Sequence, residues 1–107
     1  MDVLAFVGGA GSSQYFKDQT AHDTAWHFYN QGKIVAAICS APVILAEAGL
    51  LKGKKATVFP GDKEHLTANG VIYTGSQVEV DGRLITGNGP EAAEPFAKGL
   101  LALLEKQ

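Results

Sequence analysis

The sequence predicts one α/β domain over residues 1–107, built on a mostly parallel sheet with a β-hairpin. Glycine and proline divide the chain into alternating strand-like and helix-like segments, and the early strand-like segments are continuous apolar runs typical of buried parallel strands. Later in the chain, apolar and polar residues alternate on both sides of Asp81-Gly82, which predicts the hairpin. Hydrophobic residues make up 46% of the chain, enough for a single core.

The first half of the chain is expected to form two buried strands, each followed by a helix. The expected elements are a strand over Val3–Val7, a helix with a capping box at Thr20 and Asp23 and its end at Gly32, a strand over Ile34–Ile38, and a helix over Pro42–Ala48. Cys39 therefore lies in a strand-to-helix turn.

The second half is expected to add a strand, a short helix, the hairpin and a closing amphipathic helix. The expected ranges are strands over Lys55–Phe59 and Val71–Thr74, a helix over Asp62–Asn69, hairpin strands over Gln77–Val80 and Arg83–Thr86, and a last helix that starts at Pro90 or at Pro95. Glu91 and Glu94 are expected to serve the positive end of that last helix.

Composition excludes several classes of protein. Nine Lys and Arg against eleven Asp and Glu give a net charge of −2 and no basic surface for nucleic acid. Apolar runs are interrupted before the roughly 20 residues of a membrane span, and no signal peptide follows Met1, so we expect a cytoplasmic protein. A single cysteine excludes an internal disulfide and a cysteine-rich zinc site.

The turn at Cys39 matches a nucleophile elbow, in which a reactive side chain stands at the carboxyl edge of a sheet. The following helix, its free N–H groups and the glycine-rich run 8–11 would each favour the thiolate. The alternative is an inert thiol that only packs. The run 8–11 is either a tight turn or an anion-binding nest, and it lacks the spacing of a nucleotide site. Asp23 and His27 are better explained as exposed helix polarity than as metal ligands, so we expect neither metal nor cofactor.

Five segments of the chain form a recognisable set when they are taken in order. They are Gly8-Gly9-Ala10-Gly11, Ala37-Ile38-Cys39-Ser40-Ala41-Pro42, Ala48 to Thr57, the Asp81-Gly82 hairpin, and Thr86-Gly87-Asn88-Gly89-Pro90. This set resembles the ThiJ/PfpI superfamily, which includes the parkinsonism-associated deglycase and the PfpI-type intracellular proteases. The resemblance covers nearly the whole chain.

The resemblance implies a flavodoxin-like three-layer sandwich, usually a homodimer, with Cys39 as the reactive cysteine. Backbone amides of Gly9, Ala10 and Ser40 would stabilise an oxyanion. The candidate pocket residues are Gly8, Gly11, His65, Gly89 and Pro90.

The chain departs from the family pattern at its start and beside Cys39. Family members usually begin with a strand and helix that carry a glutamate bonded to the thiol, whereas this chain begins on the strand before the glycine run. We therefore expect a fragment or short gene model, a strand supplied by another chain, or loss of the acid. Ser40 replaces the histidine of protease-like members, and Phe59 the histidine of deglycase-like members, which disfavours a peptidase or amidase.

Three hypotheses remain. Cys39 attacks small reactive carbonyls, as in a glyoxalase or deglycase, if the acidic partner is supplied. Alternatively, Cys39 is oxidised reversibly in a redox-responsive or chaperone-like stress protein. The third is an inactive truncated form. An incomplete sheet would expose an unpaired edge, so we also expect a homo-oligomer.

Overall fold

The structure is a computed structural model, and it describes residues 3–8 and 15–106. The strands are β1 (Val3–Val7), β2 (Ile34–Ile38), β3 (Lys55–Ala56), β4 (Ile72–Tyr73), β5 (Val78–Asp81) and β6 (Leu84–Gly87), and the α-helices are α1 (Gln19–Asn30), α2 (Pro42–Glu47), α3 (Lys63–Ala68) and α4 (Ala93–Glu105). Two short 3₁₀ helices, η2 (Pro60–Asp62) and η3 (Pro90–Ala92), precede α3 and α4.

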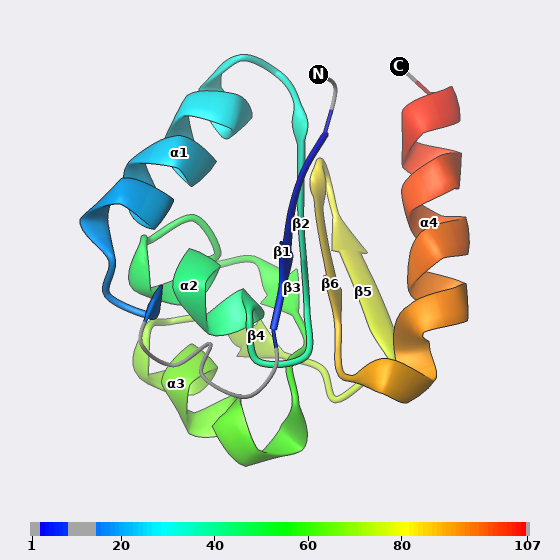
Figure 1. Cartoon of the computed structure of the whole chain (residues 1–107). Helices are drawn as coiled ribbons and strands as arrows, with labels where there is room; N and C mark the ends of the chain where they lie inside the picture. The colour runs from blue at the N-terminus through cyan, green and yellow to red at the C-terminus, as the bar shows by residue number, and fades with distance from the viewer. Residues whose placement is uncertain (1–2, 9–14, 107) are drawn as a thin grey trace.

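A four-stranded sheet forms the middle layer of the molecule, in the order β1-β2-β6-β5. The strands β1, β2 and β6 run parallel, and β5 pairs with β6 as an antiparallel hairpin. Helices α1, α2 and α3 lie on one side of this sheet and α4 lies on the other (Figure 1). This is the predicted α/β sandwich with a mostly parallel sheet.

Strand β2 is the centre of the core and is buried on both faces. Val35 and Ala37 belong to the apolar cluster under α1 and α2. Ile34, Ala36 and Ile38 belong to the cluster that packs against α4. Because every side chain of β2 is held by packing, the residue that follows it is delivered to a fixed position.

Helix α1 begins earlier than the capping box predicted. Asp18 Oδ1 accepts hydrogen bonds from the backbone N–H groups of Thr20 (2.8 Å) and Ala21 (3.2 Å), so Asp18 is the N-cap and Thr20 lies inside the first turn. The predicted box was wrong because a carboxylate two residues upstream satisfies the same free N–H groups.

The predicted strand over Lys55–Phe59 is paired only at Lys55–Ala56. Beyond that point the backbone N–H of Thr57 donates to the Oγ1 of Thr86 (2.9 Å), and the Oγ1 of Thr57 donates to the carbonyl of Ser76 (2.6 Å). Side-chain hydrogen bonds thus replace a strand ladder, and Thr57 and Thr86 are both buried.

The last helix is preceded by a 3₁₀ turn that starts at Pro90, one of the two expected starts. Pro95 lies in the first turn of α4, where its missing N–H costs no hydrogen bond.

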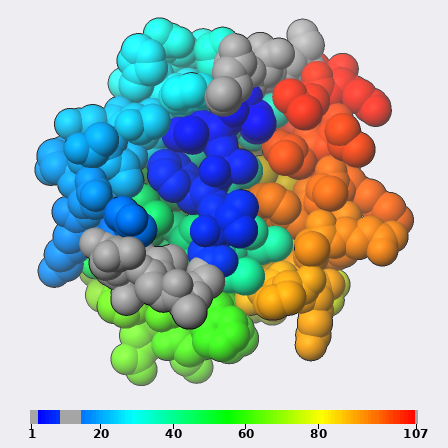
Figure 2. All heavy atoms as spheres, in the orientation of Figure 1, coloured from blue at the N-terminus to red at the C-terminus, as the bar shows by residue number. Residues whose placement is uncertain are grey.

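Strand β1 lies at the edge of the sheet, and among the described residues it pairs with β2 alone. Figure 2 shows its surface between α1 and α4, and Val7 is 78% exposed.

None of the helices that the structure describes could span a membrane, because none combines the necessary length with enough apolar residues.

Candidate functional site

Cys39 is the turn residue between β2 and α2, and its backbone is strained. Its φ is +66°, and no other non-glycine residue in 3–8 and 15–106 has a positive φ. A side chain in this left-handed region costs roughly 1–2 kcal/mol. Two hydrogen bonds hold the conformation: the Cys39 N–H donates to the Gly87 carbonyl (3.0 Å), and the Phe59 N–H donates to the Cys39 carbonyl (2.8 Å). The sheet therefore imposes an elbow on the one cysteine of the chain.

Gly8 packs directly on the amides that follow Cys39. Its N–H donates to the Ile38 carbonyl (3.1 Å), and a Cβ placed on it would lie 2.7 Å from the backbone nitrogens of both Ser40 and Ala41. The Ser40 N–H has no hydrogen-bond partner within the described ranges, whereas the Ala41 N–H donates to the Ile38 carbonyl (3.3 Å). The Ser40 amide is thus a free donor next to Cys39, and only a glycine at position 8 leaves room beside it.

The Ser40 hydroxyl is held by an acidic residue that the sequence analysis did not single out. Its Oγ donates to Oδ2 of Asp62 at 2.6 Å. Asp62 ends η2, 22 residues further along the chain, and its own N–H donates to the Phe59 carbonyl (2.8 Å). No pattern in the sequence links the two residues, because the contact exists only once α2 and η2 are packed on the same edge of the sheet.

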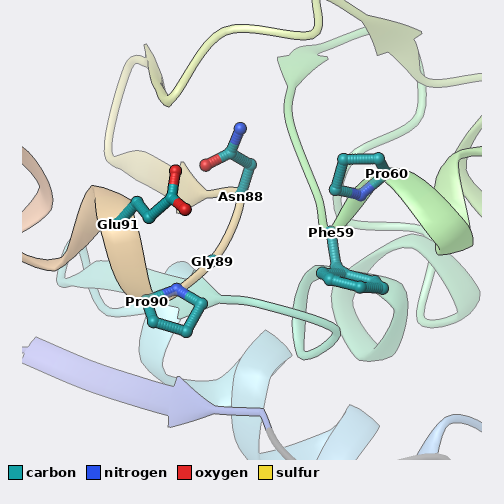
Figure 3. A pocket seen from close by; sticks show the side chains of 6 residues that line it. All are labelled: Phe59, Pro60, Asn88, Gly89, Pro90 and Glu91. Carbon is teal, nitrogen blue, oxygen red and sulfur yellow. The ribbon is translucent and has the colours of Figure 1, made fainter.

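A pocket of about 310 Å³ lies beside the elbow (Figure 3). Phe59 and Pro60 form one wall, and a segment from Asn88 to Glu91 forms the other. Both walls are anchored to Cys39, since Phe59 bonds its carbonyl and Gly87, the residue before Asn88, bonds its N–H. Phe59 is 47% exposed, so the apolar wall that it forms is open to solvent.

Besides Gly8, Cys39 and Ser40, which meet at the elbow, the predicted site residues fall into three groups. Gly89 and Pro90 line the pocket. His65 does not: it lies on α3 with its ring edge against Phe16, at 5.4 Å between ring centres. Gly9, Ala10 and Gly11 lie outside the described residues, so their expected role stays a prediction.

The side chain of Cys39 is half-buried and packs against the apolar cluster under α4. Cys39 is not one of the six lining residues, so the pocket adjoins the elbow without enclosing the thiol. Within the described ranges, no group of three or more His, Cys, Asp or Glu side chains is placed to hold a metal ion.

Comparison with known proteins places these features in a family. The model of the DJ-1/PfpI family matches residues 1–103. An uncharacterized protein of Methanocaldococcus jannaschii is 44% identical over 107 residues, covering 97% of this chain and 52% of the relative. A deglycase of Pyrococcus horikoshii is 32% identical over 104 residues, covering 97% of this chain and 63% of the relative.

A solved protein structure has the same fold as this chain. The crystal structure of a ThiJ/PfpI domain protein from Brachyspira murdochii superposes with a TM-score of 0.97 at 31% identity, covering 100% of this chain and 62% of that one. This chain therefore spans less than two thirds of the length of these relatives. The sandwich, the cysteine elbow and the matched sequence agree: the chain belongs to the DJ-1/PfpI family.

Proposed function

We propose that Cys39 is a nucleophile toward small reactive carbonyl compounds, in a glyoxalase-like or deglycase-like reaction. The observation that carries this proposal is the strained left-handed backbone of Cys39, hydrogen-bonded to Phe59 in one wall of a pocket and to Gly87, the residue before the other wall. Strain at a single non-glycine position is characteristic of functional sites, where it fixes the direction of a reacting side chain. The relationship to a protein named deglycase supports the same class of chemistry.

The first step is addition of the thiolate sulfur to an aldehyde carbon. A carbon–sulfur bond forms, the carbonyl π electrons move to oxygen, and the oxyanion takes a proton to give a hemithioacetal. The N–H of Ser40, which has no partner among the described residues, is a candidate donor to this oxyanion, and Gly8 keeps the space beside it open. Such a donor stabilises charge that develops only during addition.

Turnover of a 2-oxoaldehyde requires a base as well. The base moves the hydrogen of the former aldehyde carbon to the neighbouring carbonyl carbon, while the hemithioacetal hydroxyl loses its proton and the oxygen of that carbonyl gains one. Water then hydrolyses the resulting thioester, and a 2-hydroxy acid leaves with the thiol restored. The family resemblance assigns this base to a glutamate that hydrogen-bonds the reactive thiol. Adduct formation on Cys39 and turnover are therefore separate steps, and only turnover depends on this base.

The test is incubation of the protein with methylglyoxal, followed by intact mass for the adduct and by assay of lactate for turnover. The matched control is Cys39→Ala, which removes the sulfur and keeps a side chain at this position. We expect the adduct on the native chain and no adduct on Cys39→Ala. Equal loss of methylglyoxal with the native chain and with Cys39→Ala, and no adduct on either, would overturn the proposal.

A further inference from the structure

The pocket beside Cys39 has a single ionisable residue in its lining. Phe59, Pro60, Asn88, Gly89 and Pro90 are uncharged, and the sixth lining residue is Glu91. In Figure 3 Glu91 stands on the wall across the pocket from Phe59 and Pro60. The pocket therefore presents one carboxylate against an apolar wall.

No cation neutralises this carboxylate in the part of the chain that the structure describes. Glu91 forms no ion pair there, whereas Glu94, one turn later, pairs with Lys98 at 3.2 Å. The other acidic residue close to the elbow, Asp62, accepts the hydroxyl of Ser40 and adds further negative charge. The described residues thus place one carboxylate, that of Glu91, in the lining of the pocket and a second, that of Asp62, against the residue after Cys39.

We propose that Glu91 selects substrates by charge: the site accepts neutral and cationic carbonyl compounds and disfavours anionic ones, such as 2-oxo acids. This selectivity concerns the substrates of the proposed function and rests on it. A cation in the pocket can place one side against the carboxylate of Glu91 and another against the exposed ring of Phe59, whose π face attracts positive charge. An anion entering the same space meets the repulsion of Glu91 and gains nothing from the ring.

The size of the effect follows from the size of the pocket. A compact space of about 310 Å³ is roughly 8 Å across. One carboxylate at that distance, in a medium as polar as water, changes the ratio of rates for a monocation and a monoanion about sixfold at low salt. Partial exclusion of water from the pocket would increase this ratio, so sixfold is the lower figure.

The test measures how fast Cys39 reacts with two thiol reagents of opposite charge, independently of any turnover. The reagents are 2-(trimethylammonium)ethyl methanethiosulfonate and 2-sulfonatoethyl methanethiosulfonate. In each reaction the thiolate displaces methanesulfinate and forms a mixed disulfide, which is followed by mass. The cation-to-anion rate ratio of the folded chain is divided by the ratio for the denatured chain, which removes the intrinsic difference between the reagents.

We expect the folded native chain to prefer the cationic reagent, and Glu91→Gln to lower the normalised ratio about sixfold at low ionic strength. The matched control is Glu94→Gln, which removes the same charge from a residue outside the pocket and should change the ratio less than about twofold. Salt near 1 M should abolish the preference of the native chain, because the screening length falls to about 3 Å.

An unchanged ratio in Glu91→Gln, or an equal fall in Glu94→Gln, overturns the selection by Glu91. That result leaves the proposed function standing if methylglyoxal still adds to Cys39. Conversely, a changed ratio with no carbonyl adduct overturns the proposed function and leaves the charge at the pocket established. Failure of both reagents to modify folded Cys39 contradicts both proposals.

Discussion

Replacement of Gly8 by alanine tests the close approach on which the candidate site depends. The added Cβ would lie 2.7 Å from the nitrogens of Ser40 and Ala41 and 3.0 Å from the carbonyl oxygen of Ile38. All three are backbone atoms of the elbow, so no flexible side chain can move aside. Overpacking of this kind costs typically 1–3 kcal/mol. Alanine also restricts the unfolded chain more than glycine does, and this lower entropy of the unfolded chain offsets the cost by about 0.4–1 kcal/mol.

The net expectation for Gly8→Ala is a loss of about 1–2 kcal/mol in the free energy of unfolding. For a chain of 107 residues this corresponds to a fall of about 4–9 °C in the melting temperature. The same methyl group covers the free N–H of Ser40, so addition of methylglyoxal to Cys39 should also slow. Thermal unfolding followed by circular dichroism measures the first effect, and intact mass measures the second.

The control is Gly99→Ala, the same chemical change at a second tightly packed glycine. There the added Cβ meets only side-chain ends, Cδ1 of Ile85 at 3.0 Å and Cγ1 of Val78 at 3.8 Å, within a helix that gains from alanine. We expect no loss of stability. The reasoning is refuted if Gly8→Ala melts at the native temperature and reacts at the native rate.

Three further predictions concern contacts around the site and the sheet. The effects of Ser40→Ala and Asp62→Ala on the free energy of unfolding should be non-additive, with a coupling of about 1 kcal/mol in a double-mutant cycle measured in urea. Strict additivity would mean that their 2.6 Å hydrogen bond has no role in stability. Replacement of Arg83 by methionine should cost about 1–3 kcal/mol in the same assay, because its guanidinium donates to the Tyr29 carbonyl (2.7 Å) and lies 4.2 Å from the Tyr29 ring centre; a stability within error of native contradicts this. Finally, if the expected homo-oligomer forms through the free edge of β1, Val7→Lys should shift sedimentation toward the monomer, and an unchanged distribution would locate the interface elsewhere.

The sequence alone predicted the elements whose patterns are local. The buried run of β2, the hairpin at Asp81-Gly82 and the strand-to-helix turn at Cys39 all depend on residues close together in the chain. The family resemblance is of the same kind, because it rests on short motifs in a fixed order. These parts needed no knowledge of contacts between distant residues.

Local patterns failed where distant groups compete for the same hydrogen bonds. The strand expected over Lys55–Phe59 was cut short because Thr57 bonds to Thr86 and Ser76, which lie beside it only in the folded sheet. The start of α1 was also misplaced, although the cause there is local. The side chain of Asp18, two residues before Thr20, caps the helix in place of Thr20.

What the sequence by itself determined is the class of fold, the position of the elbow and the identity of the residue in it. Tertiary structure alone decided what surrounds that residue. Asp62 reaches Ser40, and Glu91 joins Phe59 across a pocket, because segments 22 and 32 residues apart in the chain end on one edge of the sheet. The sequence had offered Glu91 only as a helix-end charge. Side chains brought together by packing leave no periodic trace in the chain, and the chemistry of the pocket depends on those side chains.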